Sequence, residues 1–268
     1  MKRKLDNIAN LGIAVDFLTF DKNSVLAEAL ADRVACELSD AIIEKGNASL
    51  VVAGSRAFVL FFRLLSRAPV DWSKVTISLT DECYVPLTDT RSHEKFVREN
   101  LLQEGAEQAN FVGLYNKAIT CNLAAFQAAN KIALLSQPFD VVVLDMGEDG
   151  HTASLVPGAD RLQQALDINT KAVILPLCSK SFSEPRLTMT LPLLSSARFM
   201  AVYIEGQKKL NILQQALEEN NESLPICKVL KHAAQVPHIY WAPREAKESF
   251  TTSDHWAQTK DNSPQYFS

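Results

Sequence analysis

A short, strongly apolar segment that ends in a glycine-rich turn constrains the fold of this chain more than any other feature. Residues 139–144 read Phe-Asp-Val-Val-Val-Leu, and β-branched residues in such a run favour a strand buried on both faces. The run stops at Gly-Glu-Asp-Gly-His, residues 147–151, and small residues compatible with a helix follow. In parallel α/β sheets, ligands bind where a strand ends and the next helix begins. The segment therefore predicts a site at its carboxyl end.

His151 is the side chain in this turn best suited to chemistry, because an imidazole titrates near neutral pH and can move a proton. Gly147 and Gly150 leave backbone N–H groups uncovered beside it. Composition alone favours a hydrogen-bonded structural histidine instead. The two glycines are also compatible with a turn that needs positive φ. The position between a strand and a helix favours the functional interpretation of His151.

The rest of the chain alternates between strand and helix patterns. Apolar residues recur every four positions from Leu26 to Ile42, which predicts a helix capped by Asn23 or Ser24 and ended by Gly46. A further helix is expected to follow Gly54-Ser55-Arg56 and to end at residue 65, and others are expected at 92–102, 121–135 and 207–217. Strands are expected at 49–53, 75–79, 139–144, 172–175, 187–190, 199–204 and 238–241. This order predicts an α/β fold, a parallel-rich, Rossmann-like sheet with helices on both faces.

Composition limits the domain organisation and the classes of partner. With 268 residues, 47% of them hydrophobic, we expect one domain over residues 1–250, with or without a small lobe, and a polar tail over 251–268. The net charge of −4 and the lack of a basic stripe argue against nucleic acid. Neither a signal peptide nor a membrane-length apolar run is seen. Five scattered cysteines suggest neither disulfides nor zinc, so we expect a cytoplasmic protein.

Two further strand ends carry residues capable of chemistry. Gly54 and Ser55 precede a helix, where free N–H donors at the positive end of the helix dipole suit a phosphate or carboxylate. A tight turn with a serine cap explains the same residues equally well. Asp81 and Glu82 directly follow a strand and can orient hydroxyls or move protons, although solvated loop acids are the alternative.

Cationic side chains stand at two other corners of the predicted sheet. Arg186 precedes a strand, and Lys209 follows Gly206 at a strand-to-helix corner. Arginine and lysine that converge on one anion are a standard phosphate-binding arrangement. Together, these residues and His151 predict a pocket for a sugar phosphate.

The ordered set of motifs resembles the 6-phosphogluconolactonase family, relatives of glucosamine-6-phosphate deaminase. The segment 147–158, Gly-Glu-Asp-Gly-His-Thr-Ala-Ser-Leu-Val-Pro-Gly, is similar to the family signature almost without change. Asp-Glu-Cys-Tyr-Val-Pro at 81–86 and Arg-Leu-Thr-Met-Thr at 186–190 resemble two further blocks, and Lys209 falls on a family lysine. The resemblance covers residues 48–213 in order.

The resemblance implies a lactone hydrolase of the oxidative pentose phosphate pathway that needs no metal or cofactor. His151 would be the general base that activates water against the carbonyl of 6-phosphoglucono-δ-lactone, with Asp149 fixing its tautomer and Asp81 and Glu82 as further acids. The N–H groups near Gly147 and Gly150, or a nearby cation, would stabilise the oxyanion. The residues implied for the phosphate are Gly54, Ser55, Arg186, Lys209 and Lys180. The implied partner is a small phosphorylated sugar lactone, bound by a monomer or a homodimer.

The chain departs from the family pattern at four places, the first of which is residues 53–57, where the family has Gly-Gly-Ser-Thr-Pro. Cys83 replaces the arginine after Asp-Glu, and His93 replaces the asparagine after Ser92. A thiol cannot replace a guanidinium, so we hypothesise that Arg56, in Ala-Gly-Ser-Arg-Ala at 53–57, supplies the missing charge. His93 either joins the site or is a solvated histidine at a helix start. Asp145, where the family usually has glycine, adds a negative charge near the turn.

Two other functions remain as alternatives at this point. A glucosamine-6-phosphate deaminase usually has Ile-Ala-Phe after the Gly-His, whereas this chain has Thr-Ala-Ser at 152–154. A non-catalytic sugar-phosphate-binding protein is the other alternative, but such a protein would not need His151. The lactonase is therefore the leading prediction.

Overall fold

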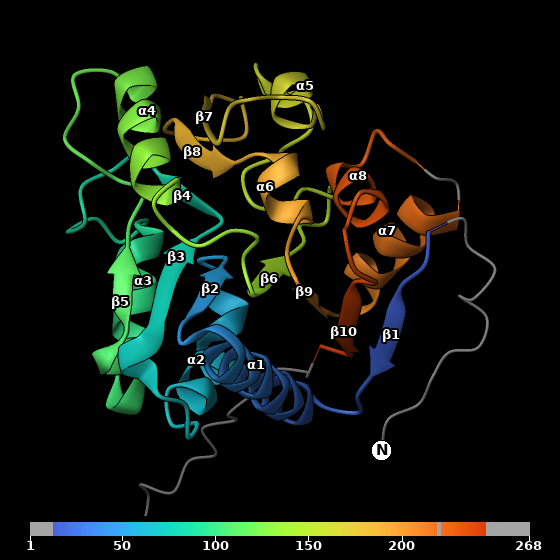
Figure 1. Ribbon diagram of the computed structural model, residues 1–268. Coiled ribbons are helices and arrows are strands. Elements are labelled where there is room, and N and C mark those ends of the chain that lie inside the picture. The colour runs from blue at the N-terminus through green and yellow to red at the C-terminus, as the bar shows by residue number, and fades with distance from the viewer. Residues whose placement is uncertain (1–12, 219–220, 245–268) are drawn as a thin grey trace, which may run out of the picture.

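The computed structural model describes residues 13–218 and 221–244, and its main element is a parallel sheet (Figure 1). Within these residues seven strands pair in the order β1-β10-β9-β6-β2-β3-β5. They are β1 (Asp16–Thr19), β10 (His238–Ala242), β9 (Phe199–Glu205), β6 (Val141–Asp145), β2 (Ala48–Val52), β3 (Val75–Leu79) and β5 (Asn110–Val112). All pairings in this sheet are parallel. The predicted α/β fold is confirmed.

Strand β6 lies at the centre of the sheet, between β9 and β2. Val141 is in register with Phe199 on one side and with Leu50 on the other. The first four residues of β6 are buried, as the apolar run predicts for a strand covered on both faces. The strand ends at Asp145, immediately before the glycine-rich turn.

A second, antiparallel sheet of three strands lies beside the carboxyl ends of the first. Its order is β4 (Asp81–Cys83), β8 (Arg186–Met189) and β7 (Ile174–Leu177). The sequence interpretation allowed residues 81 and 82 to be solvated loop acids, and this is wrong because they form β4 and are buried. The N–H of Met189 donates to the carbonyl of Thr80 at 2.8 Å, which joins the two sheets directly.

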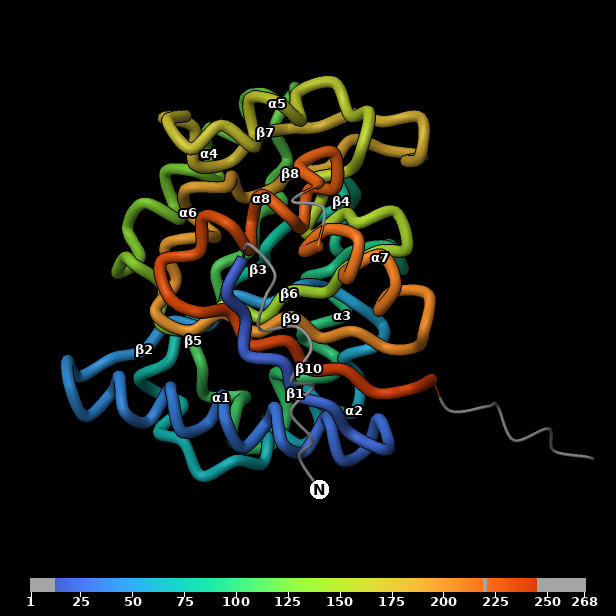
Figure 2. Tube along the Cα trace, turned by 90° about the vertical axis from the view of Figure 1, so that its right-hand side faces the viewer, coloured from blue at the N-terminus to red at the C-terminus, as the bar shows by residue number. Residues whose placement is uncertain are grey.

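The helices pack around the two sheets, and Figure 2 shows their arrangement from the side. The long helix α1 (Asn23–Lys45) packs against α2 (Val59–Leu65) and β2. In both views these two helices lie on the side of the large sheet away from the small one. The others are α3 (His93–Asn100), α4 (Cys121–Ile132), α5 (Leu162–Ala165), α6 (Leu191–Ser195), α7 (Gln207–Glu218) and α8 (Pro225–Lys231).

Two details of the helices differ from the sequence prediction. Lys22, not Asn23 or Ser24, is the N-cap of α1, although Gly46 ends the helix as expected, with φ 82° and an N–H bond to Ile42. No helix follows His151 directly, since α5 begins only at Leu162. The expected polar tail, 251–268, lies outside the described residues. None of the described helices is long and apolar enough to cross a membrane.

Candidate active site

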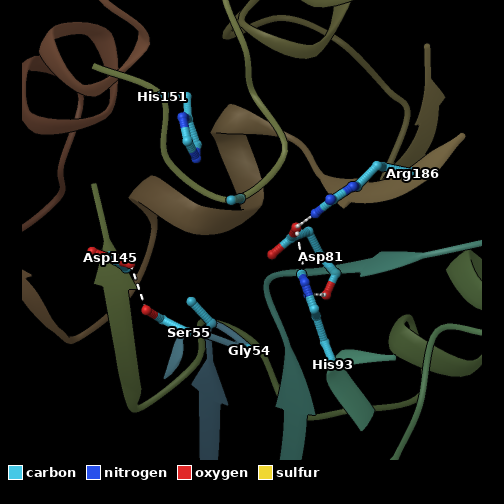
Figure 3. A pocket seen from close by; sticks show the side chains of 9 residues that line it. Gly54, Ser55, Asp81, His93, Asp145, His151 and Arg186 are labelled. Carbon is cyan, nitrogen blue, oxygen red and sulfur yellow. Dashed lines mark hydrogen bonds and ion pairs between the residues drawn. The ribbon is translucent and has the colours of Figure 1, made fainter. Parts of the chain in front are cut away.

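A cavity of about 140 Å³ opens where the large sheet meets the small sheet (Figure 3). We call it the main cavity. Its walls come from the ends of β2 and β6, from the turn after β6, and from β4, β8 and α3. Its lining residues are Ala53, Gly54, Ser55, Asp81, His93, Asp145, His151, Ala153 and Arg186. The structure thus brings together four of the corners that the sequence singled out.

His151 stands on the turn after β6 and lines the main cavity. Its Nδ1 lies 2.5 Å from a carboxylate oxygen of Asp149. This hydrogen bond lowers the pKa of Asp149 to about 2, so the carboxylate is ionised at neutral pH. Because a carboxylate only accepts, Nδ1 is the donor, and in the neutral imidazole Nε2 is then the nitrogen with the lone pair. Figure 3 shows the ring directed into the cavity, where Nε2 can take a proton from a bound water or hydroxyl.

Two glycines allow this turn to form. A Cβ at Gly147 would overlap the His151 ring and the Asp149 carboxylate. Gly150 has φ 74°, which a glycine adopts without strain, and a Cβ there would meet Leu224. Both residues are therefore needed for the geometry of His151.

The N–H groups of Gly147 and Gly150 are already occupied, which corrects the expectation that these two stabilise an oxyanion. The N–H of Gly147 donates to the carbonyl of His151 at 2.9 Å, and that of Gly150 to the carbonyl of Gly147 at 3.1 Å. The N–H of His151 donates to Asp149. Neither glycine lines the main cavity. Their role is to shape the turn.

Asp145 is tied to two neighbouring segments at the end of β6. The hydroxyl of Ser55 donates to it at 2.6 Å, and the Lys209 ammonium lies 2.7 Å from its other oxygen. Lys209 does not itself line the main cavity, and its charge is matched by Asp145. Ser55 also accepts from the N–H of Ala57, as a cap does. In the part of the chain that the structure describes, no acceptor meets the N–H groups of Gly54 or Ser55.

Asp81 is the buried anion of the opposite wall. Its carboxylate accepts from the Ser154 hydroxyl at 2.5 Å and from the Thr80 hydroxyl at 2.9 Å. Arg186 Nη1 lies 3.9 Å and His93 Nδ1 3.6 Å from the same carboxylate oxygen. Burial alone would raise the pKa of Asp81, but these cations and hydroxyls outweigh it and hold that pKa well below its usual range. Asp81 is therefore an ionised anchor for two cations.

Glu82 points away from the main cavity and has a structural role. Its carboxylate accepts from the N–H groups of His93 and Glu94, both at 2.7 Å, and from the Ser92 hydroxyl at 3.2 Å. It also accepts from the N–H of Cys83. Complete burial raises the pKa of Glu82. The expectation of a catalytic acid here is corrected, because the carboxylate is taken up in capping α3.

His93 lines the main cavity, so the alternative of a solvated histidine at a helix start is wrong. The ring is only 16% exposed and is held by Asp81, because α3 begins directly against β4. The sequence offered one signal for this contact, namely that the chain departs from the family at both 83 and 93. Cys83 Sγ indeed lies 3.8 Å from His93 Nε2.

Besides Lys209, two further predicted cations lie outside the main cavity. Arg56 is exposed at the first position of the 3₁₀ turn η2 (Arg56–Phe58). It lines a neighbouring cavity of about 250 Å³, the side cavity, together with Cys83, Arg91 and Glu184. Lys180 is exposed in the loop between β7 and β8 and lines neither cavity. The cations on the wall of the main cavity are instead Arg186 and His93, so the hypothesis of charge from Arg56 is not supported by this placement.

The described residues contain no group of three or more His, Cys, Asp or Glu side chains arranged as metal ligands.

Comparison with known proteins connects this geometry to one family. A family model described as glucosamine-6-phosphate isomerases/6-phosphogluconolactonase matches residues 21–241. A 6-phosphogluconolactonase of Rhizobium meliloti is 46% identical over 225 residues, which cover 84% of this chain and 97% of the relative. One from Mesorhizobium japonicum is 41% identical over 232 residues, covering 87% and 97%. The crystal structure of a 6-phosphogluconolactonase from Shewanella baltica superposes with a TM-score of 0.82 at 36% identity, over 87% of this chain and 99% of that one.

Proposed function

The chain belongs to the glucosamine-6-phosphate isomerase/6-phosphogluconolactonase family, and from this we infer that it hydrolyses 6-phosphoglucono-δ-lactone to 6-phosphogluconate in the oxidative pentose phosphate pathway of the cytoplasm. The observation that carries the proposal is the His151–Asp149 pair, which leaves Nε2 free at a cavity walled by anion-binding groups. The relatives that bear this name are matched over nearly their whole length.

His151 acts as the general base in the proposed reaction. Nε2 removes a proton from a water molecule as its oxygen attacks the ring carbonyl, and the Asp149 carboxylate stabilises the imidazolium that forms. When the ring C–O bond breaks, the imidazolium returns the proton to the leaving ring oxygen. A positioned base of this kind typically contributes about 10²–10⁴-fold in rate.

The phosphate of the substrate occupies the wall opposite His151. The uncovered N–H groups of Gly54 and Ser55 lie there, and Arg186 faces them across the cavity. Backbone N–H groups and a guanidinium are strong donors to phosphate oxygens. The Nε of Arg186 is buried without a hydrogen-bond partner among the described residues, so a ligand oxygen would satisfy it.

The first test is a pH-stat assay on freshly prepared 6-phosphoglucono-δ-lactone, with spontaneous opening subtracted. We expect His151→Ala to lower kcat by about 10²–10⁴-fold. The matched control is His232→Ala, at the end of α8 and outside the main cavity, which we expect to match the wild type.

The alternatives give different outcomes in the same set of assays. Ammonia release from glucosamine 6-phosphate would identify a deaminase. Binding of 6-phosphogluconate without any turnover would identify a sugar-phosphate-binding protein. Lactone turnover that survives in His151→Ala would remove His151 as the base.

A further inference from the structure

His93 occupies a position in the site that the proposed mechanism does not use. Its side chain projects from the first residue of α3 to the wall between the main cavity and the side cavity. It lines both cavities, as do Gly54 and Arg186. A Cβ at Gly54 would overlap the His93 ring, so the glycine is what lets the ring lie against the turn after β2. That turn carries the uncovered N–H groups.

The hydrogen bonds of the ring fix one of its protons. Nδ1 lies 2.9 Å from the backbone carbonyl oxygen of Asp81. Because a carbonyl only accepts, Nδ1 must be a donor. The Asp81 carboxylate lies 3.6 Å from the same nitrogen. Among the described residues, the hydrogen-bond partner of Nε2 is the Cys83 sulfur, at 3.8 Å. Sulfur is a weak partner, whether it donates or accepts.

The surroundings favour a second proton, and thus the imidazolium form. Burial alone would lower the pKa of His93, but the charge and hydrogen bond of Asp81 outweigh it and raise that pKa well above its usual value. Asp81 is itself held in its ionised form. Other titratable or charged groups share the two cavities with the ring or lie next to it. They are Glu82 and Cys83 on β4, Arg186 on β8 and Glu184 just before it, Arg56 and Arg91 in the side cavity, and Asp145 and His151 across the main cavity.

The balance of charge differs between the two walls of the main cavity. On one wall the charge of Asp145 is matched by the Lys209 ammonium, which does not itself line the cavity. On the other wall the single negative charge of Asp81 is shared by Arg186 and His93. Among the residues that line the main cavity, this second wall therefore carries two cations and one anion, and it faces the N–H groups of Gly54 and Ser55. Glu184, which lies 3.7 Å from Arg186, lines only the side cavity. A bound anion is what a surplus of cations attracts.

We propose that His93 is a binding residue for the phosphate end of the substrate, where its imidazolium acts together with Arg186. The inference rests on the proposed function for the identity of the ligand. It assigns to His93 the positive charge that Cys83, an uncharged thiol in this role, does not provide. It also predicts that His93 affects binding of phosphorylated ligands and not the chemical step at His151.

The direct test is calorimetric titration of the wild type and His93→Asn with 6-phosphogluconate and with gluconate, which lacks the phosphate. We expect the Kd of 6-phosphogluconate to rise by about 10- to 100-fold in the variant, as for the loss of one charge-assisted contact. The Kd of gluconate should stay as in the wild type. An equal weakening of both ligands, or no weakening of either, would overturn the proposal.

Two further arms keep the test valid if His93→Asn folds poorly. Between pH 7 and pH 9 the phosphate stays a dianion, so wild-type affinity for 6-phosphogluconate should fall as pH rises through the raised pKa of His93. Cys83→Ser should bind like the wild type, whereas tighter binding would mean that a Cys83 thiolate neutralises the imidazolium. Wild-type binding that stays flat while NMR shows the His93 ring losing its proton would contradict the proposal.

Failure of this inference can be told apart from failure of the proposed function. Wild-type lactone turnover reports on the function alone. If the wild type hydrolyses the lactone and His93→Asn raises KM with little change in kcat, both statements stand. Normal turnover with unchanged KM in the variant removes only the role of His93. Phosphate-dependent binding without turnover removes only the enzymatic activity.

Discussion

The site contains two histidines whose partners give them different duties. His151 is bonded to the half-exposed carboxylate of Asp149, and its free nitrogen faces the main cavity. His93 is bonded to the buried Asp81 and is held as a cation. In the roles that we propose, the same type of side chain serves as a base in one environment and as a fixed charge in the other.

Only one of these two histidines could be assigned from the sequence. The glycines and the aspartate around His151 are all within four residues of it, so the local motif carries the information. The environment of His93 depends on how α3 packs against β4, and on a glycine 39 positions away that leaves room for the ring. Apart from the paired departures from the family pattern at 83 and 93, the sequence carries no local pattern that predicts this environment.

Replacement of Asp149 tests the orienting role of its carboxylate. In Asp149→Asn the amide can donate to Nδ1, which would place the imidazole proton on Nε2 and remove its ability to accept. We expect kcat to fall, at most by the full contribution of the base, which is about 10²–10⁴-fold. The control is Glu148→Gln, which removes a neighbouring exposed acid whose contact is Lys208. Equal kcat values for both variants and the wild type would exclude an orienting role.

At the scale of elements, burial and periodicity decided what was predictable. Helix α1 and strands β2, β3, β6 and β9 were found within a few residues of their bounds, because long apolar periods and buried runs have few competing structures. The short elements β4 and β5 were missed. They have three residues each and form through pairing with β8 and β3, which are distant in sequence. Local propensity does not determine such pairings.

Helix α3 provides a test at this scale, because its start is capped by a side chain from another element. The N–H groups of His93 and Glu94 donate to different oxygens of the Glu82 carboxylate. In Glu82→Gln one of these two donors would therefore face an amide NH₂, which cannot accept its hydrogen bond. We expect a loss of about 1–3 kcal/mol in the free energy of unfolding, measured with urea. Glu99→Gln, on the exposed side of the same helix, should cost much less. Equal stability of the two variants would show that the cap contributes nothing.

At the scale of the whole molecule, the site lies where the two sheets meet. Thr80 accepts from Met189 through its carbonyl, and the next residue, Asp81, anchors both cations of the wall. The sequence predicted the large sheet and the corners that meet at its carboxyl ends. It did not predict the small sheet as a separate layer, because residues 81–83 looked like a loop. The burial of Asp81 and Glu82 follows from that layer.

The Asp81–His93 pair should make the stability of the fold depend on pH. A raised pKa for His93 in the folded state stabilises the protein below the unfolded value of 6.5, and this contribution is lost as pH rises through the folded value. The lowered pKa of Asp81 works in the opposite direction, so its contribution is lost as pH falls below 3.8. Both contributions to stability are therefore present together only above pH 3.8 and below the raised pKa of His93.

Urea unfolding at pH 6 and pH 9 would check this dependence. We expect the wild type to lose about 1–3 kcal/mol more than His93→Asn between these two pH values. His232→Asn, at the end of α8, serves as the control and should follow the wild type. Parallel losses in the wild type and in His93→Asn would mean that His93 is not charged in the folded protein.

The absence of a side chain at residue 54 has a consequence for how this lineage can diverge. An imidazole at 93 fits only while nothing larger than hydrogen projects from residue 54. A methyl group gained at 54 would be tolerated only in a descendant that had already exchanged the ring for something smaller. Residue 93 must therefore change before residue 54 can gain a side chain. A chimera that combines His93 with a larger residue at position 54 is expected to contain this steric clash.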